Sequence, residues 1–280
     1  MTSFQAKDSF AKEVAKNEPN LNLARAALLL AGYITQTGET PTYYLTLLDD
    51  MAEAVRPAIA PAPTAAVAAL ESLNHYLFTE LGFAGNRDDY YNPNNSFLNQ
   101  VLDVRTGIPI SLSLIYLEVG WRLGLPLHGV GLPGHFIVGY TLPQAALYID
   151  VFNGGRILSE DECLALSTIP LTNRAAFRQN YLLPVSKKAM LFRMLLNLKQ
   201  IYLQHEAWEL AHRTLDLMLI VRPAQSDEFR DRGLVALRLQ RWHEAAFDLR
   251  RYLFLTPNAP DLVELKQHLD MLEERLNRLN

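Results

Sequence analysis

The fold is decided by residues 131–150, GLPGHFIVGYTLPQAALYID. Two runs rich in β-branched and aromatic residues flank the turn-like segment TLPQA, a pattern that predicts a β-hairpin. If Tyr140 pairs with Ala145 across the four intervening residues, the register places His135 directly opposite Asp150. Directly opposed residues have Cβ atoms about 4.5 to 5.5 Å apart, so a carboxylate reaches an imidazole N–H. We therefore expect Asp150 to hold His135 in one tautomer.

A helix expected just before this hairpin supplies a hydroxyl group. The segment IPISLSLIYLEVGWRLG predicts an apolar, buried helix that opens near Pro109 and stops at Gly124. Ser111 lies in its first turn, where the helix dipole stabilises an anion. Ser111, His135 and Asp150 would then be nucleophile, general base and orienting group.

Each of these residues also has a structural interpretation. The hydroxyl of Ser111 can be satisfied within the first turn of its helix. His135 and Asp150 can form a hydrogen-bonded pair that specifies the core without catalysing a reaction. The sequence leaves both interpretations open.

The segment YYNPNN, residues 90–95, precedes a short amphipathic helix that Asn94 or Asn95 would cap. One interpretation is a loop stabilised by local asparagine hydrogen bonds. The other is that Tyr90, Tyr91 and Asn95 line the mouth of a cleft above Ser111 and His135.

Helical periodicity dominates the two ends of the chain. Three apolar blocks at helical spacing between about residues 20 and 83 predict a small helical subdomain. Near the C-terminus, WELAHRTLDLMLIVRP and WHEAAFDLRRYLFLTP align at the 34-residue period of tetratricopeptide repeats. In this register Trp208 aligns with Trp242, and Ala211 with Ala245. We expect about two repeats, which would present a surface to a protein or peptide.

Composition and charge exclude some classes of partner and site for this chain. A net charge of −4 with mixed signs predicts no nucleic acid and no membrane as partner. The N-terminus has no long apolar core, so we expect a soluble, cytoplasmic protein. The single cysteine, Cys163, excludes an internal disulfide, and His128 and His135 lack the further ligands of a zinc site. We therefore expect no metal and no cofactor.

Several motifs together resemble known proteins. They are GN at residues 85–86, NPNNSFLNQVLDVRTGIPISLSLIYLEV, RLGLPLHGVGLPGHFIV, IDVFNGG and RDRGL. The combination is similar to the bacterial SirB-type proteins, which join a transglutaminase-like domain to tetratricopeptide-like repeats. The resemblance implies a Cys, His, Asp triad, and Ser111 stands in the place of the cysteine.

The resemblance and the periodicity together predict the architecture. The expected fold class is α+β and mainly helical, with a short antiparallel sheet in a transglutaminase-like core. We expect an N-terminal helical subdomain at residues 1–84, the core at 85–184 and an all-α tetratricopeptide-like module at 185–280.

Two functions follow from this architecture. The first is a non-enzymatic or degenerate transglutaminase-like protein that acts as an interaction or regulatory factor through residues 185–280. The alternative is a serine-dependent hydrolase or acyltransferase that uses Ser111, His135 and Asp150 on a protein amide or ester. The sequence decides neither the activity nor the oligomeric state.

Overall fold

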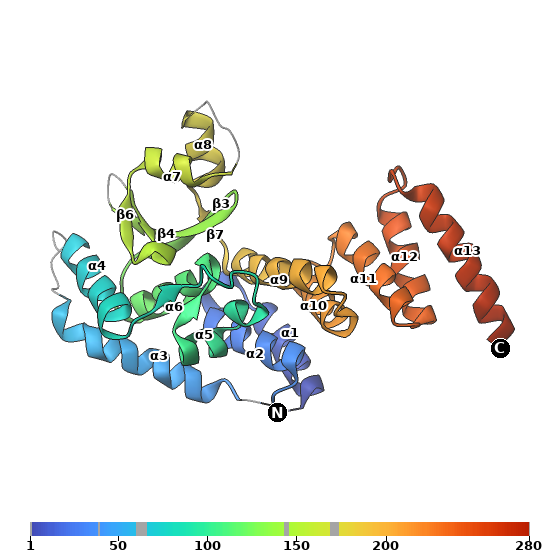
Figure 1. Ribbon diagram of the computed structural model, residues 1–280, viewed down its shortest axis with the longest axis horizontal. Coiled ribbons are helices and arrows are strands. Elements are labelled where there is room, and N and C mark those ends of the chain that lie inside the picture. Colours follow the sequence, from blue (N-terminus) through green and yellow to red (C-terminus); the bar gives the residue numbers. More distant parts are fainter. Residues whose placement is uncertain (1, 39, 60–65, 143–145, 169–173, 280) are drawn as a thin grey trace. The chain divides into compact units, whose positions relative to one another are not determined.

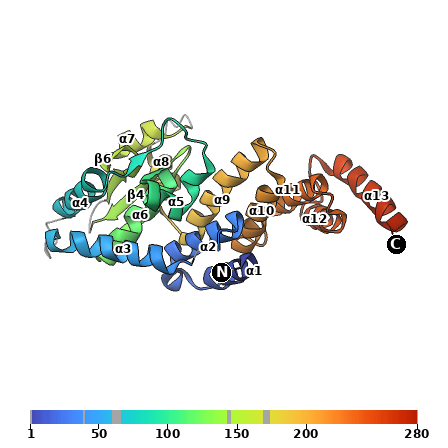
Figure 2. The same cartoon turned by 60° about the horizontal axis from the view of Figure 1, so that its bottom comes forward.

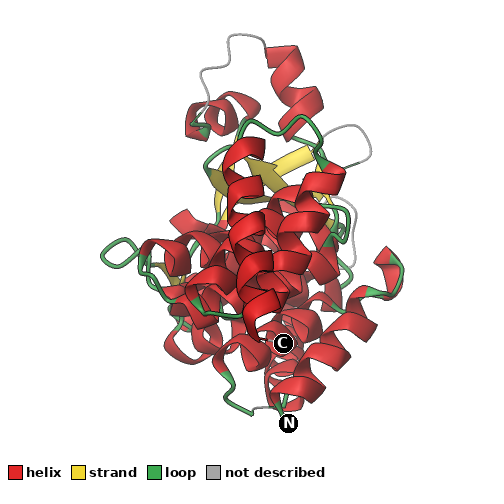
Figure 3. Cartoon of the chain, turned by 90° about the vertical axis from the view of Figure 1, so that its right-hand side faces the viewer, coloured by secondary structure: helices red, strands yellow, loops and turns green. Residues whose placement is uncertain are grey.

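The computed structural model describes residues 2–38, 40–59, 66–142, 146–168 and 174–279 (Figure 1). Within them the chain is mostly helical, and most of the strands belong to one sheet (Figure 3). The expected fold class is confirmed. The chain forms two compact units, Met1–Gly32 with Gln36–Met194, and Tyr33–Thr35 with Leu195–Asn280. The finer division at residues 84 and 184 stays a prediction.

Helices make up the N-terminal part of the first unit (Figure 2). The three apolar blocks correspond to α2 (Leu23–Thr35), α3 (Thr42–Val55) and α4 (Ala66–Asn74), the last of which continues as a π-helical turn, His75–Glu80. Helix α1 (Ser3–Val14) precedes them. None of the described helices is long and apolar enough to cross a membrane.

Helix α6, Pro109–Arg122, is the central helix of the first unit. It begins at the predicted proline, and Gly124 follows its end with a φ of 77°. Every residue from Pro109 to Gly120 is buried. Helix α6 packs against strands β3 (Leu127–Leu132) and β4 (His135–Thr141). The sequence-based prediction of this buried helix is confirmed.

Strands β3 and β4 belong to a five-stranded sheet of order β6-β5-β4-β3-β7, in which all neighbours are antiparallel. The other strands are β5 (Ala146–Asp150), β6 (Arg156–Leu158) and β7 (Pro184–Val185). Leu132 pairs with His135, so Pro133 and Gly134 form a two-residue turn. Gly134 has a φ of 80°, which a type II turn requires at this position. This turn places His135 at the start of β4.

The predicted register between β4 and β5 is wrong by two residues. Tyr140 pairs with Leu147 rather than with Ala145. Thr141 remains in β4 because its N–H donates to the carbonyl of Pro126 at 3.0 Å, and this lengthens the strand beyond the predicted end. Residues 143–145 of the predicted loop lie outside the described residues.

The remaining elements of the first unit are short. Strands β1 (Ala84–Gly85) and β2 (Thr106–Gly107) form a two-residue parallel pair. A 3-10 turn, Pro93–Ser96, leads into α5 (Leu98–Val104). Helices α7 (Glu160–Leu166) and α8 (Arg174–Tyr181) follow the sheet strands β5 and β6.

The helical repeat predicted for the C-terminal region is confirmed. The helices are α9 (Lys187–Gln204), α10 (Trp208–Val221), α11 (Ser226–Arg238), α12 (Trp242–Leu255) and α13 (Leu262–Leu279). The two aligned tryptophans, Trp208 and Trp242, each open a helix. Ala211 and Ala245 are fully buried, as helix pairs that approach closely require.

Buried ion pairs connect the helices of the second unit. Arg232 of α11 donates to Asp216 of α10 at 2.7 Å and, through Nε and Nη2, to both oxygens of Asp248 of α12. Asp216 also accepts the hydroxyl of Tyr33 at 2.6 Å. Asp248 is 1% exposed and the Arg232 side chain 19%, so the loss of the Asp248 charge leaves a largely buried guanidinium group with one charged partner fewer.

We expect Asp248→Asn to destabilise the second unit by about 3 kcal/mol, the lower end for breaking a buried pair, because Asp216 still pairs with Arg232. Urea unfolding followed by fluorescence in a Trp121→Phe background measures this, since the two remaining tryptophans lie in the second unit. The control is Glu209→Gln, which removes an ion pair from a half-exposed carboxylate and should cost under about 1 kcal/mol. Equal losses in the two variants would contradict the role of the buried pair.

Candidate functional site

His135 and Asp150 are in contact, as the sequence predicted, although they are not directly opposed. The Nε2 atom of His135 lies 3.0 Å from Oδ1 of Asp150. The observed register makes the two residues diagonal neighbours across β4 and β5. A register error of two residues keeps every side chain on its face of the sheet, because side chains alternate with a period of two. The predicted pair therefore forms in spite of the wrong register.

Asp150 is almost fully enclosed by partners. Its side chain is 2% exposed, and its second oxygen, Oδ2, accepts the Nδ2 of Asn153 at 2.6 Å. Burial raises the pKa of Asp150, but the hydrogen bonds from His135 and Asn153 outweigh burial and bring the pKa below its ordinary value. Asp150 is therefore ionised at neutral pH. Because an ionised carboxylate only accepts, Nε2 of His135 carries the hydrogen of this contact.

Ser111 lies in the first turn of α6, and its hydroxyl bonds to the main chain. Its Oγ accepts the N–H of Ile108 at 3.1 Å and lies 2.6 Å from the carbonyl oxygen of Asn95, to which it donates. Its side chain is 0% exposed. No hydrogen bond joins Ser111 to His135, although both residues lie in the described part of the chain.

Gly107 provides the space for this hydroxyl. A Cβ atom added at Gly107 would lie 2.8 Å from Oγ of Ser111 and 2.9 Å from Val101. Strand β2, which contains Gly107, therefore packs directly against the first turn of α6.

Asn95 stabilises the loop before α5 through its side chain. Its Nδ2 donates to the carbonyl groups of Asp89 at 2.7 Å and Tyr90 at 3.1 Å, and its Oδ1 accepts Nδ2 of Asn86 at 3.0 Å. Asn95 is 4% exposed. Local asparagine hydrogen bonds, one of the two interpretations of this segment, are therefore present.

The predicted helix cap is wrong. Helix α5 begins after Phe97, which has no side-chain cap, and neither Asn94 nor Asn95 caps it. The side chain of Asn95 is occupied by the loop, and Asn92 instead accepts the N–H of Asn94 at 2.9 Å.

Tyr90 and Tyr91 are 37% and 69% exposed, respectively. That these tyrosines and Asn95 line a cleft stays a prediction.

Three residues near His135 were not singled out from the sequence. Asn153 binds Asp150, Arg87 donates to Oδ1 of Asn153, and the ring of Phe152 lies 6.1 Å from that of His135, edge to face. Asn153 and Phe152 belong to the motif IDVFNGG, which contributes to the family resemblance. The sequence analysis assigned neither residue a role in the site.

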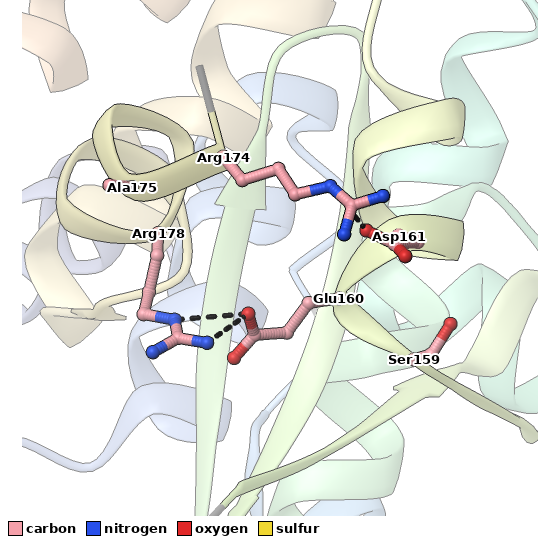
Figure 4. A pocket seen from close by; sticks show the side chains of 6 residues that line it. All are labelled: Ser159, Glu160, Asp161, Arg174, Ala175 and Arg178. Atoms are coloured by element: carbon pink, nitrogen blue, oxygen red, sulfur yellow. Dashed lines mark hydrogen bonds and ion pairs between the residues drawn. The ribbon is translucent and has the colours of Figure 1, made fainter. Parts of the chain in front are cut away.

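Cys163 and a surface pocket are two further features of the first unit. Cys163 is fully buried, and burial raises the pKa of its thiol to about 12, which makes it an unreactive thiol. A surface pocket of about 370 Å³ lies at α7 and α8, where arginines pair with acidic residues (Figure 4). Its lining is Ser159, Glu160, Asp161, Arg174, Ala175 and Arg178. Within the described residues, no group of three or more His, Cys, Asp and Glu side chains is arranged to hold a metal ion.

Comparison with known proteins agrees with this architecture. Residues 42–196 match the transglutaminase-like superfamily, and residues 198–270 match a tetratricopeptide repeat. The chain is 41% identical to a UPF0162 protein of Xylella fastidiosa over 212 residues, which cover 74% of this chain and 75% of that protein. The chain belongs to the UPF0162 family, within the transglutaminase-like superfamily.

Two further relatives differ in the share of their own length that the match covers. A UPF0162 protein of Vibrio cholerae is 32% identical over 206 residues, which cover 73% of this chain and 76% of that protein. Human F-box only protein 21 is 36% identical over 191 residues, which cover 64% of this chain and 30% of that protein. The likeness to UPF0162 proteins thus extends over most of each chain.

The lowered pKa of Asp150 makes a prediction for stability. A carboxyl group with a lowered folded-state pKa stabilises the fold above its unfolded pKa of about 3.9, and this contribution is lost as the pH falls through the lower value. We expect the stability difference between the unchanged chain and Asp150→Asn to be present at pH 5 and to shrink toward pH 2.

Urea unfolding at each pH measures this difference through Trp121, with Trp208 and Trp242 replaced by Phe. Asp88→Asn, which changes an exposed carboxyl group in the same unit, is the control. A difference that stays constant or grows on acidification would show that Asp150 is not stabilised in its ionised form.

Proposed function

We propose that this UPF0162 protein is a non-enzymatic, degenerate transglutaminase-like protein that acts as an interaction or regulatory factor through its tetratricopeptide-like module. We also propose that the protein is of the bacterial SirB type and that it lies in the cytoplasm. The observation that carries it is the state of the Ser111 hydroxyl group.

A nucleophilic hydroxyl needs a lone pair directed at substrate and a base that takes its proton. The hydroxyl of Ser111 accepts from one main-chain group and donates to another, and it has no access to solvent. For attack, the bond to Asn95 would have to break and a buried carbonyl group would lose its donor, which costs about 1 to 3 kcal/mol. These contacts favour the structural interpretation of Ser111.

The second unit carries the side chains that an interaction module needs. Exposed apolar residues lie on its last two helices, Phe247 and Phe254 on α12, and Val263 and Met271 on α13. Phe247 and Phe254 are seven residues apart and therefore share one face of α12. Exposed apolar groups on a repeat module favour a protein or peptide as partner.

One observation favours the alternative function. Nε2 of His135 is held by an ionised, buried carboxylate, which is how a general base is oriented, and no hydrogen bond to Nδ1 is seen within the described residues. In a serine-dependent hydrolase or acyltransferase, Ser111 would attack an amide or ester after rotating toward Nδ1, and Asp150 would stabilise the imidazolium ion.

Labelling separates the two functions. We expect a fluorophosphonate probe to leave Ser111 unmodified. We also expect the thiol introduced by Ser111→Cys, in a Cys163→Ala background, to resist iodoacetamide at all pH values below about 8.5, the ordinary thiol pKa, because position 111 is 0% exposed. Mass spectrometry of the peptide that contains residue 111 measures both reactions. Fluorophosphonate labelling that His135→Ala abolishes, or alkylation well below pH 7 that depends on His135, would instead support the enzyme.

A pull-down with matched variants tests the interaction role. We expect a protein from a bacterial lysate to bind the immobilised chain, and Phe247→Ser with Phe254→Ser to abolish this binding, because both side chains are more than 60% exposed on α12. The control is Phe4→Ser, which removes a phenylalanine that is 81% exposed in the first unit. If no bound protein depends on residues 185–280, the proposed function is wrong.

A further inference from the structure

Four rings form a connected series in the first unit. Tyr91 contacts Tyr90 at 5.3 Å between ring centroids, Tyr90 contacts Phe152 at 6.1 Å, and Phe152 contacts His135 at 6.1 Å. The planes of each pair are steeply inclined, at 78°, 76° and 84°. The series leads from the exposed Tyr91 to the half-buried His135. We call these four residues the ring series.

One arginine lies over a ring of the series, and the charge of a second arginine acts on another ring. The guanidinium carbon of Arg87 lies 5.4 Å from the centroid of Phe152, and this arginine also donates to Asn153. Arg193 of α9 is half-buried, and its charge opposes the burial that raises the pKa of Tyr90. Within the described residues, neither arginine forms an ion pair with a carboxylate.

The acidic groups of this region are engaged elsewhere or exposed. Asp150 is held by His135 and Asn153, and Asp89 accepts Nδ2 of Asn92 at 2.9 Å. Asp88 is exposed, and among the described residues it forms no ion pair with Arg87 or Arg193. In contrast, Arg156 and Arg178 of the same unit pair with Glu162 and Glu160, respectively. Arg87 and Arg193 therefore have no carboxylate partner among the described residues, and Arg87 keeps N–H donors beyond the one that binds Asn153.

We propose that Arg87, Arg193 and the ring series form a binding site for an acidic peptide segment of a partner protein, separate from the tetratricopeptide-like module. Guanidinium groups bind carboxylates through paired hydrogen bonds, and the positive edges of aromatic rings also favour anions. The exposed rings supply apolar surface, which a free inorganic anion would not use.

The spacing of the rings favours an extended chain. In an extended peptide, side chains on one face are two residues apart, which is about 6.6 Å. Neighbouring rings of the series are separated by 5.3 to 6.1 Å. At successive positions of this one face, an apolar side chain can therefore rest on a ring and a carboxylate can reach an arginine, while the intervening side chains point away from the surface.

Fluorescence anisotropy with the full chain tests this site. The probe is an acetylated, amidated peptide of the repeat Leu-Ser-Glu-Ser, which places Leu and Glu on the same face of an extended chain, and it carries a neutral dye. The reference peptide has Gln in place of Glu. We expect the Glu peptide to bind at least about tenfold more tightly than the Gln peptide, the effect of one charge-assisted hydrogen bond of about 1.4 kcal/mol. Arg87→Ala should abolish this preference, and Tyr91→Ala should weaken the binding of both peptides.

Two control variants make the test specific. Arg251→Ala removes another arginine that lies over a phenylalanine ring, at 5.7 Å from Phe254. Tyr43→Ala removes another exposed tyrosine, which is 65% exposed and in edge contact with Tyr44 at 5.0 Å. Both variants should bind the two peptides as the unchanged chain does.

Four outcomes would overturn the proposal. They are binding of neither peptide, equal binding of both, losses in the control variants equal to those of Arg87→Ala and Tyr91→Ala, and displacement of the Glu peptide by millimolar inorganic phosphate. The last outcome would identify a site for a small anion instead.

Discussion

The start of α6 depends on one hydroxyl group. Ser111 accepts from the N–H of Ile108 and donates to the carbonyl of Asn95, so two buried main-chain groups are satisfied by a single side chain. The contact requires Gly107, because a Cβ atom there would collide with the hydroxyl. The loop before α5, strand β2 and the first turn of α6 are joined at this point. Since α6 packs against β3 and β4, the position of the sheet follows from it.

The sequence predicted the features that depend on period and alternation. The 34-residue offset predicted the C-terminal helices, because each repeat must bury the same face against its neighbour. Alternation along the strands predicted that His135 and Asp150 share a face, and this result survived a register error of two residues. The face of the sheet on which a side chain lies depends only on whether its position along the strand is odd or even. The register also depends on the loop and on contacts such as that of Thr141 with Pro126, which the sequence does not reveal.

The sequence did not predict the contacts that loops make. Asn153 completes the shell of Asp150, and Arg87 lies over Phe152, but their positions are set by a turn and by the β1–β2 pair. Gly85 illustrates the constraint, since a Cβ atom there would lie 2.6 Å from the ring of Phe152. The same holds for Asn95, whose amide bonds to the loop rather than to a helix N-terminus. An asparagine fits either use, so residue type alone does not separate a cap from a loop contact.

The chemistry of position 111 connects the fold to the question of activity. A hydroxyl group is a good donor and a good acceptor, so serine can satisfy the carbonyl of Asn95 and the N–H of Ile108 at once. A thiol is weak in both roles, and it would leave these buried groups poorly satisfied while offering a better nucleophile. The same site therefore cannot be optimal for both tasks. In this chain the distances of 2.6 and 3.1 Å match the structural task, and within the described residues the His135–Asp150 pair forms without a hydrogen bond to Ser111.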